Sequence, residues 1–493
     1  MSRQSPSDSS PPASLSLTPE LSATAIRTRC SDLRNRLIED GLFHAEPRAE
    51  GAPGVLSWRI SPEPFYLTPR ELQSLRELGP RLLAFYTALN QLYLASVKGR
   101  QPEWISRYLD QGKPETVVAL GRMNRFRSLL PGVLRPDLIL TEDGWMASEL
   151  DSVPGGIGLT AWMSRYYAGL GFQPVGGPEG MIDGFAAMIR SAAGNDSPTL
   201  AIIVSEESRD YRPEMLWLGA QLNARGLKTF VLEPDAVRFS EEGLYLSREG
   251  LDIPLHVVYR FFELFDLKNI PKSELILYSA RKETTALTPP VKAYLEEKMA
   301  FALYHHPALR PYWSQALGGE TDAALTRIFP RTWILDPREV PPHAVIPNLT
   351  FRGRPVTNWR ELFSATQKER HLVLKPSGFS ELAWGSRGVS VGHDLPETEW
   401  RQGLERALER FPDSPSVLQE FHTGKKVEVR YDDTGEAEPR LMKGRVRLSP
   451  YYFVSAGKAE LGGVLATICP VDKKLIHGMT EAVMAPCAVI PKE

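Results

Sequence analysis

The chain has 493 residues, of which 42% are hydrophobic and 24% are charged, a composition typical of a folded protein with several structural units. A formal net charge of −2 offers a polyanion little electrostatic attraction, so no nucleic acid partner is expected. Three widely separated cysteines show neither metal-ligand spacing nor a disulfide framework, and no apolar run is long enough to span a bilayer. We therefore expect a cytoplasmic protein with no membrane partner.

The N-terminal part divides into a polar tail and a helical region. Residues 1–25 are rich in Ser, Pro and Thr, and such a segment predicts a disordered tail because it cannot bury enough apolar surface. Thr68 and Glu71 have the spacing of a capping box, with a proline in the first turn. Leucines then recur at helical spacing, which predicts a long amphipathic helix. Residues 26–135 are expected to be mainly helical.

A β-hairpin is predicted over residues 138–151, and a glycine-rich loop, Pro154–Gly158, follows it. Glu149 and Asp151 are two residues apart, so their carboxylates share one strand face. Neighbouring carboxylates repel each other unless a cation lies between them, and magnesium prefers oxygen ligands. These two residues are therefore candidate magnesium ligands. A capped turn before Pro154 is the alternative for Asp151, but it does not account for Glu149.

The pattern changes near residue 197. Three short apolar runs, at residues 200–204, 228–232 and 257–260, are typical of buried parallel strands, and a helix is predicted between the first two. Strands that alternate with helices favour a small α/β domain.

A later apolar strand ends in Lys375, which places an ammonium group where it can meet a phosphate. The Gly/Ser loop that follows, residues 377–389, contains Gly385 and Gly388, and glycines let backbone N–H groups approach phosphate oxygens closely. Glu381 in the same loop is a candidate third magnesium ligand. The alternative is a mobile surface loop.

Two further segments suit a nucleotide. Gln419, Glu420 and Phe421 end an apolar strand, and such an end suits an adenine and ribose pocket, whereas an edge strand is the alternative. Arg445 and Arg447 lie on one face of a predicted hairpin, where two guanidinium groups suit a triphosphate or an acyl-phosphate. A solvated basic face is the alternative here.

In this order along the chain, from about residue 120 to residue 489, the motifs resemble the circularly permuted ATP-grasp enzymes. The nearest types are the eukaryotic-type glutathione synthetases and the glutathionylspermidine synthetase-like proteins. The resemblance implies an α/β (α+β) fold: a circularly permuted ATP-grasp with an inserted small α/β substrate domain. By this likeness, residues 136–196 form part of the core with the metal strand, 197–290 the substrate domain, and 291–493 the nucleotide-binding region.

The resemblance also implies roles for single residues. Lys298 would be the first ATP lysine and Lys375 the second, while Arg122 would lie near the acceptor carboxylate. Gly462 and Gly463 would belong to a Gly/Ala-rich lid. The sequence departs from the family in three ways: Asp151 stands where the family has asparagine, Glu381 lies further past the lysine, and the substrate-recognition segments do not match.

Together these features predict an ATP-dependent ligase that joins a carboxylate to an amine through an acyl-phosphate, with ATP and Mg²⁺ as cofactors. The resemblance implies small-molecule substrates, an amino acid, a small peptide or a polyamine, and a homodimer. Arg447 and Arg445 would stabilise charge on the acyl-phosphate. Two alternatives stay open: a small-molecule kinase that uses the same ATP site, and a nucleotide-binding protein without catalysis.

Overall fold

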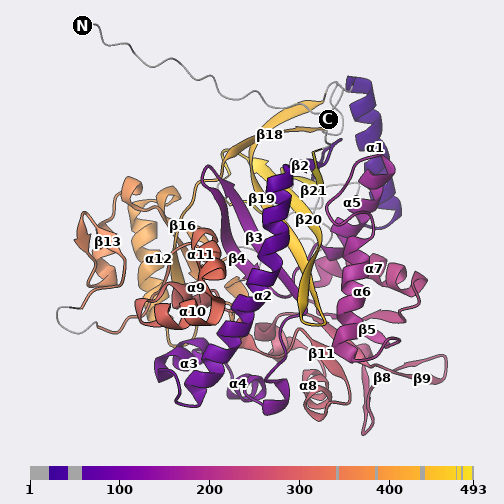
Figure 1. Cartoon of the computed structure of the whole chain (residues 1–493), viewed down its shortest axis with the longest axis horizontal. Coiled ribbons are helices and arrows are strands. Elements are labelled where there is room, and N and C mark those ends of the chain that lie inside the picture. The colour runs from indigo at the N-terminus through magenta and orange to yellow at the C-terminus, as the bar shows by residue number, and fades with distance from the viewer. Residues whose placement is uncertain are drawn as a thin grey trace.

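The computed structural model describes residues 22–42, 58–339, 344–383, 387–432, 439–473, 475–478 and 481–490. A large mixed sheet lies at its centre (Figure 1), with the order β1-β21-β20-β19-β3-β4 and with β18 beside β19 and β2 beside β21. Its described strands are β1 (Arg59–Ile60), β2 (Phe65–Leu67), β3 (Val133–Thr141), β4 (Gly144–Asp151), β18 (Lys426–Tyr431), β19 (Arg440–Ser455), β20 (Lys458–Pro470) and β21 (Val483–Val489).

Helices cover both faces of this sheet. Adjacent side chains of a strand point to opposite faces, and Tyr452 of β19 packs in the core cluster of α2 (Pro69–Val97), whereas Tyr451 packs in the cluster of α5 and α6. The predicted capping box of Thr68 and Glu71 at the start of α2 is confirmed. The helices of the N-terminal half are α1 (Ala23–Glu39), α3 (Glu103–Asp110), α4 (Glu115–Gly121), α5 (Ile157–Gly169) and α6 (Gly180–Ala193).

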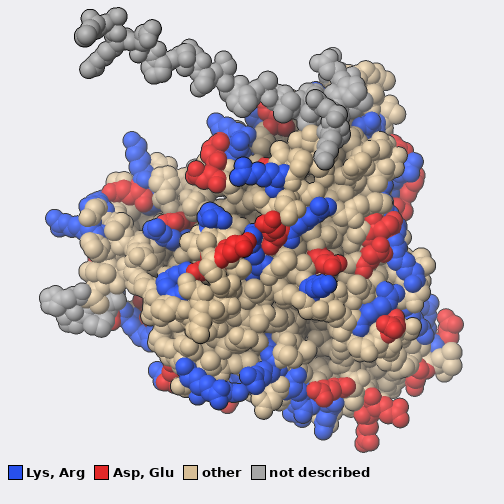
Figure 2. Space-filling view, in the orientation of Figure 1, with Lys and Arg blue, Asp and Glu red and all other residues tan. Residues whose placement is uncertain are grey.

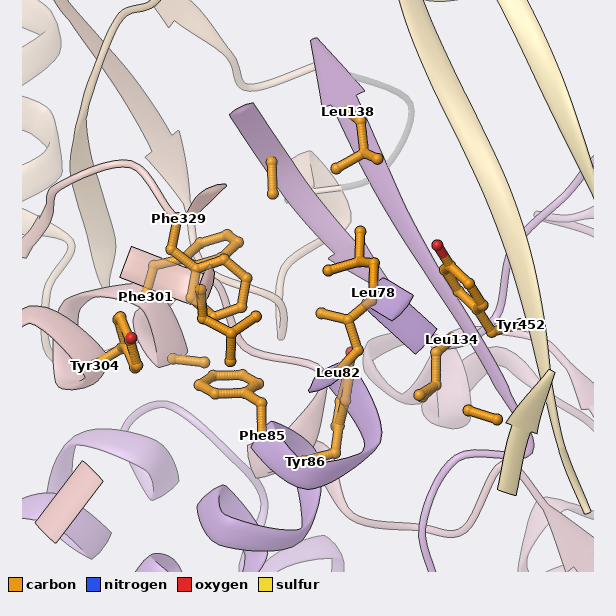
Figure 3. Packing of buried hydrophobic residues seen from close by; sticks show 14 of the residues in the cluster. Leu78, Leu82, Phe85, Tyr86, Leu134, Leu138, Phe301, Tyr304, Phe329 and Tyr452 are labelled. Atoms are coloured by element: carbon orange, nitrogen blue, oxygen red, sulfur yellow. The ribbon is translucent and has the colours of Figure 1, made fainter. Parts of the chain in front are cut away.

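An aromatic core joins α2 to the helices after it. Phe85 stacks on Trp313 with ring centroids 5.3 Å apart and meets the edge of Phe329 at 5.0 Å. Figure 3 shows α2 side chains between this aromatic group and residues of β3 and β19. The helices on the aromatic side are α9 (Met299–His305), α10 (Arg310–Leu317) and α11 (Gly319–Ile328).

A small antiparallel sheet lies to one side of the large one, with the order β12-β17-β15-β16 (Figure 1). Helix α12 (Glu397–Glu409) packs on one face of this small sheet. Residues of the small sheet also line a cavity together with residues of the large sheet. The strands of the small sheet, and a two-stranded ribbon next to it, are β12 (Thr332–Ile334), β15 (Leu372–Pro376), β16 (Ser390–Val391), β17 (Ser416–Glu420), β13 (Thr350–Phe351) and β14 (Arg354–Pro355).

The predicted α/β stretch forms a parallel sheet on the other side, with the order β11-β10-β5-β6. The three strands expected from apolar runs are confirmed, and β11 adds a fourth among the described residues. A three-stranded ribbon and two helices complete this α/β unit. The elements are β5 (Leu200–Val204), α7 (Arg212–Ala224), β6 (Thr229–Leu232), β7 (Arg238–Ser240), β8 (Gly243–Arg248), β9 (Leu251–Pro254), β10 (Val257–Phe261), α8 (Ser273–Lys282) and β11 (Ala286–Thr288).

The surface charge, the helices and the N-terminal segment can each be compared with what the sequence predicts. Figure 2 shows basic and acidic side chains interspersed over one face, with a band of Lys and Arg along the lower edge. Across the described ranges, none of the helices is long and apolar enough to cross a membrane. Helix α1 begins at Ala23, inside the segment predicted to be a disordered tail, and residues 1–21 of that segment lie outside the described residues.

Candidate active site

A cavity of about 350 Å³ lies between the small antiparallel sheet and the large sheet. Strands β3, β4 and β19 of the large sheet line one side, and β15, β16 and β17 of the small sheet line the other. Strands that are far apart in sequence therefore bring most of the predicted site to one place. The candidate residues among those that line the cavity are Glu149, Lys375, Gln419, Glu420, Phe421, Arg445 and Arg447.

Lys375 lines this cavity, and its side chain is buried. Its Nζ donates hydrogen bonds to the backbone oxygen of Ser148 at 2.8 Å and to Oε1 of Gln419 at 2.7 Å, and both acceptors are neutral. Ser148 is the extra residue of a β-bulge, because the register of β4 against β3 shifts there. Burial lowers the pKa of Lys375 to about 8, although Glu149 acts in the opposite direction.

Arg447 provides a second cation to the cavity. Its Nη1 lies 3.0 Å from Oδ2 of Asp137, a buried carboxylate that also accepts a hydrogen bond from the hydroxyl of Ser449 at 3.0 Å. Within the described part of the chain, the buried Nε of Arg447 has no hydrogen-bond partner. Arg445 is turned towards the backbone, where its Nε donates to the carbonyl oxygen of Gly424 at 3.1 Å. The cavity thus combines a buried ammonium group with a guanidinium N–H that lacks an acceptor, as suits an anion.

The side of the cavity formed by the end of β17 is polar and aromatic. Gln419 donates from Nε2 to the hydroxyl of Thr332 at 3.2 Å, which fixes the amide orientation that accepts from Lys375. Burial raises the pKa of Glu420, and Arg331 opposes this with a nitrogen 3.9 Å from the carboxylate. The ring of Phe421 meets the edge of His393 with centroids 4.5 Å apart. A flat, partly apolar base with polar edges can fit such a surface.

A second cavity of about 50 Å³ adjoins the first, and Glu149 lines both. The carboxylates of Asp151, Glu263 and Glu296 line it too, together with Lys298. Nζ of Lys298 lies 2.7 Å from Oε1 of Glu149 and donates to the backbone oxygen of Ala383 at 3.2 Å. Burial lowers the pKa of Lys298, but the nearby carboxylates, Glu149 foremost and then Glu263 and Glu297, together hold it above its ordinary value.

Three of the four carboxylates that line the small cavity are paired with cations, whereas no ion pair of Glu263 is found among the described residues and burial raises its pKa well above the ordinary value. Oδ2 of Asp151 accepts a hydrogen bond from Nη2 of Arg135 at 2.8 Å, and Glu296 pairs with Arg260. Burial raises the pKa of Asp151 although Arg135 lowers it. Where the chain is described, no three His, Cys, Asp or Glu side chains are arranged to hold a metal ion. Oxygen ligands for a metal are present, but Glu149, Asp151 and Glu296 each need their cation to move away first.

The two lysine-bearing segments are locked together by close packing. The loop after Lys375 lies against the turn before Lys298, and a Cβ atom at Gly378 would overlap the backbone oxygen of Glu296. The carboxylate of Glu297 accepts a hydrogen bond from Gly378 N at 3.2 Å and another from the hydroxyl of Ser377. At Gly378, therefore, glycine allows a close approach of backbone to backbone.

Other predicted residues lie elsewhere. Glu381 is exposed and Arg122 forms an ion pair of 2.5 Å with Asp110; neither lines the two cavities. Gly388 packs against the backbone of Leu382 beside the first cavity, and Gly385 lies outside the described residues. The roles proposed for these residues stay predictions.

The predicted glycine lid was wrong as a description of structure. Gly462 and Gly463 lie inside strand β20, paired with β19, and do not line either cavity. A Cβ atom at Gly462 would overlap the ring of Phe453, and one at Gly463 would overlap Met181 of α6. These glycines permit α6 to approach the sheet, and a Gly/Ala-rich composition alone did not distinguish that role from a mobile loop.

Sequence reasoning missed the partners of the predicted charges. Arg135 and Asp137 stand on β3 directly opposite Asp151 and Glu149 of β4. The predicted hairpin began only at residue 138, whereas β3 begins at Val133, and the alternation of Arg135 and Asp137 with apolar neighbours was a usable signal for the longer strand. Glu263 comes two residues after the end of β10 and follows the rule that ligand-facing groups lie beyond the carboxyl ends of parallel strands.

Comparison with known proteins gives the fold but not the family. No protein-family model matches the chain, and no curated protein matches it. A glutathione synthetase-like effector from Globodera pallida, solved in its apo form, is similar in structure, with a TM-score of 0.55 at 12% identity over 94% of this chain and 96% of that chain. A protein assigned as a gamma-glutamylcysteine synthetase from Methylobacillus flagellatus covers 84% of this chain and 87% of its own at 12% identity, with a TM-score of 0.41. The predicted mixed α/β architecture is confirmed, and it is similar to that of the glutathione synthetase-like effector.

Proposed function

We propose that this chain is an ATP-dependent ligase of the circularly permuted ATP-grasp type that joins a small-molecule carboxylate to an amine. The single observation that carries the proposal is the cavity between the two sheets, where Lys375 is buried against neutral acceptors and Arg447 retains an unpartnered N–H among the described residues. Buried positive charge without a counter-charge is costly, so it is typical of a site where a ligand supplies the negative charge. A nucleotide triphosphate is such a ligand.

Different residues of the cavity would contact different parts of the nucleotide. Gln419, Glu420 and Phe421 would contact the base and ribose, and Lys375, whose Nζ lies 2.7 Å from Oε1 of Gln419, would contact the phosphates. Arg447 lies on the large-sheet side, where it can stabilise charge on a phosphoryl group in transfer. Fold similarity to a glutathione synthetase-like effector supports a ligase over other ATP-dependent classes.

Magnesium fits the oxygen ligands of the small cavity once their cations move. Glu149 is the first candidate ligand because it lines both cavities, and Asp151 is the second. Magnesium usually takes one or two carboxylates and completes its shell with water and substrate phosphates, so a full protein cage is not required. When bound, the ion would neutralise charge on the phosphates during transfer.

The proposed reaction has two steps. A carboxylate oxygen of the first substrate attacks the γ-phosphorus of ATP, the bond from that phosphorus to ADP breaks, and an acyl-phosphate forms. The amine nitrogen of the second substrate then attacks the acyl carbon, inorganic phosphate leaves, and the nitrogen loses a proton. Lys375 and Arg447 would hold the phosphates in line, and the walls of the cavity would keep water from hydrolysing the acyl-phosphate.

The test measures ADP and phosphate release from MgATP with pooled small carboxylates and amines, with mass spectrometry to identify a product. We expect release that needs both pools in the wild-type protein, and a loss of at least about 100-fold in Lys375→Ala and Glu149→Ala. Lys368→Ala, at an exposed lysine outside both cavities, is the matched control.

Each other outcome has a distinct meaning. ADP release that needs the carboxylate pool but no amine would replace the ligase by a kinase. ATP binding without turnover in any mixture, unaffected by either substitution, would remove both the reaction and the site, and leave a binding protein.

A further inference from the structure

The glycine-rich loop 154–158 joins β4, the strand of Glu149 and Asp151, to helix α5. A buried carboxylate, that of Glu214, accepts hydrogen bonds from the backbone at the end of this loop. Oε1 of Glu214, from α7 of the α/β unit, accepts a hydrogen bond from Gly156 N at 2.6 Å, and Oε2 accepts one from Leu159 N at 3.0 Å. These N–H groups belong to the start of α5, where a helix leaves its amides without intrahelical partners. The partial positive charge of that helix end also favours a carboxylate.

The packing around this contact explains the glycines. A Cβ atom at Gly158 would overlap the backbone oxygen of Glu214, and one at Gly155 would overlap the ring of Tyr211. From the opposite side, the hydroxyl of Tyr451 on β19 donates a hydrogen bond to the backbone oxygen of Gly155 at 2.8 Å. The loop is therefore held between the α/β unit and the large sheet, and larger residues would push the two apart.

The same loop continues directly from the candidate metal strand. Asp151 is the last residue of β4, and its Oδ1 accepts a hydrogen bond from Val153 N at 2.8 Å. On β19, Tyr451 is spaced by two and by four residues from Ser449 and Arg447, so the three share a strand face. The contacts of the loop thus fix the end of β4 relative to the strand that carries Arg447.

We propose that Glu214 is a positioning residue that holds the end of β4, and with it the carboxylate of Asp151, by clamping the glycine-rich loop from the α/β unit. This inference rests on the proposed function for its catalytic consequence. Helix α7 follows the carboxyl end of β5, the edge where parallel sheets bind ligands. Glu214 is then the link through which a substrate bound at that edge reaches the metal strand.

The ionised carboxylate is the form that accepts both N–H groups. Burial raises the pKa of Glu214 to about 7, although the amides of Leu159, Gly156 and Gly158 lower it, as does Arg135. The other titratable groups that face it are Tyr211, Tyr259 of β10 and Tyr451 of β19. The clamp therefore weakens as the pH falls through about 7, when one oxygen takes up a proton.

The test compares wild type with Glu214→Gln, which keeps the shape of the side chain but sets an NH₂ group against one of the two N–H donors. Hydrogen exchange at pH 8 is measured for peptides that cover residues 150–160, with the β15 peptide as an internal reference. We expect exchange about tenfold faster in residues 152–160 of the variant and unchanged in β15. Glu103→Gln, at an exposed glutamate in the first turn of α3, is the matched control.

Steady-state kinetics then separate positioning from folding. In Glu214→Gln we expect kcat for ADP release to fall by at least about tenfold, KM for MgATP to change by less than about threefold, and the acid limb of the pH profile near pH 7 to disappear. Unchanged exchange in residues 152–160 would overturn the inference whatever the activity does. Faster exchange with unchanged kcat would overturn it too. If wild type shows no turnover at all, the proposed function fails, and the exchange data still decide whether Glu214 holds the loop.

Discussion

The lysines of the two adjoining cavities differ in their partners. In the larger one, both hydrogen bonds of Lys375 go to neutral oxygen atoms, and burial lowers its pKa to about 8. In the smaller one, Lys298 pairs with Glu149 at 2.7 Å and Asp151 accepts from Arg135 at 2.8 Å. Among the described residues Lys375 of the larger cavity has no carboxylate partner, although Arg447 beside it pairs with Asp137. In the smaller cavity Lys298 and three of the four carboxylates are paired within the protein.

This difference suggests an order of events for the proposed reaction. The larger cavity is ready for an anion, because among the residues that the structure describes Lys375 forms no ion pair that would have to break first. In the smaller cavity Glu149 can bind a cation only after Lys298 leaves it, and the phosphates of a bound nucleotide would give that ammonium group a new partner. We therefore expect the nucleotide to enter first and to open the carboxylates for magnesium.

The largest expected effect comes from removing the unmatched charge. Lys375→Met should weaken binding of a fluorescent ATP analogue on the order of 100-fold, because the phosphates lose a charge-assisted partner. The midpoint of thermal unfolding should not fall, since the cost of burying an ammonium group disappears with it. Lys368→Met is the control. An affinity within threefold of wild type would mean that the larger cavity does not hold the phosphates.

Removing one matched charge should have a smaller and different effect. Glu149→Gln keeps the shape of the side chain but loses the ion pair with Lys298 and one metal ligand. We expect the magnesium concentration for half-maximal ADP release to rise about tenfold, with nucleotide affinity changed far less. Glu142→Gln, at an exposed residue of the same hairpin, is the control. If nucleotide affinity fell as much as in Lys375→Met, the two cavities would act as one site.

The smallest expected effect is a pH dependence of nucleotide affinity that arises from Lys375 in the larger cavity. Lysine carries its charge below its pKa, so with a pKa of about 8 for Lys375, nucleotide affinity should fall as the pH rises from 7 to 9. The loss is at most about tenfold, because a charged fraction falls tenfold for each pH unit above the pKa. In Lys375→Arg the profile should be flat, since guanidinium does not titrate in this range. If nucleotide affinity of the wild-type protein did not change between pH 7 and pH 9, Lys375 would not titrate in this range, which would contradict a lowered pKa for it.

Sequence patterns predicted the elements better than the contacts. The strands that end in Lys375 and Gln419, and the hairpin with Arg445 and Arg447, follow from short apolar runs and turn residues, which are local signals. The pairing of Lys298 with Glu149 joins residues far apart in the chain, so no local pattern contains it. The pairing of Asp137 with Arg447 is non-local in the same way, although the alternation of Asp137 with apolar residues was a local signal for its strand.

Glycine was the least predictable residue type. Gly462 and Gly463 were assigned to a lid, but they lie in β20 where α6 packs closely. At Gly378 a side chain is excluded by a neighbouring segment of backbone, since a Cβ atom there would overlap the backbone oxygen of Glu296. In both cases the cause is a distant element, and the sequence alone records only the missing side chain.

The bulge at Ser148 constrains this protein in a way that side chains do not reveal. Its carbonyl oxygen receives Lys375, and any amino acid provides a carbonyl, so substitutions at this position leave that acceptor in place. The loss of Ser148 itself would be more serious, because it would remove that carbonyl. Glu149 and Ala147 would stay on opposite faces, since they pair with the adjacent residues Asp137 and Leu138 of β3. The count of residues in this hairpin, more than their identity, is what the active-site geometry requires. Insertions and deletions near residue 148, rather than point changes, are then the alterations by which a related chain would lose this site.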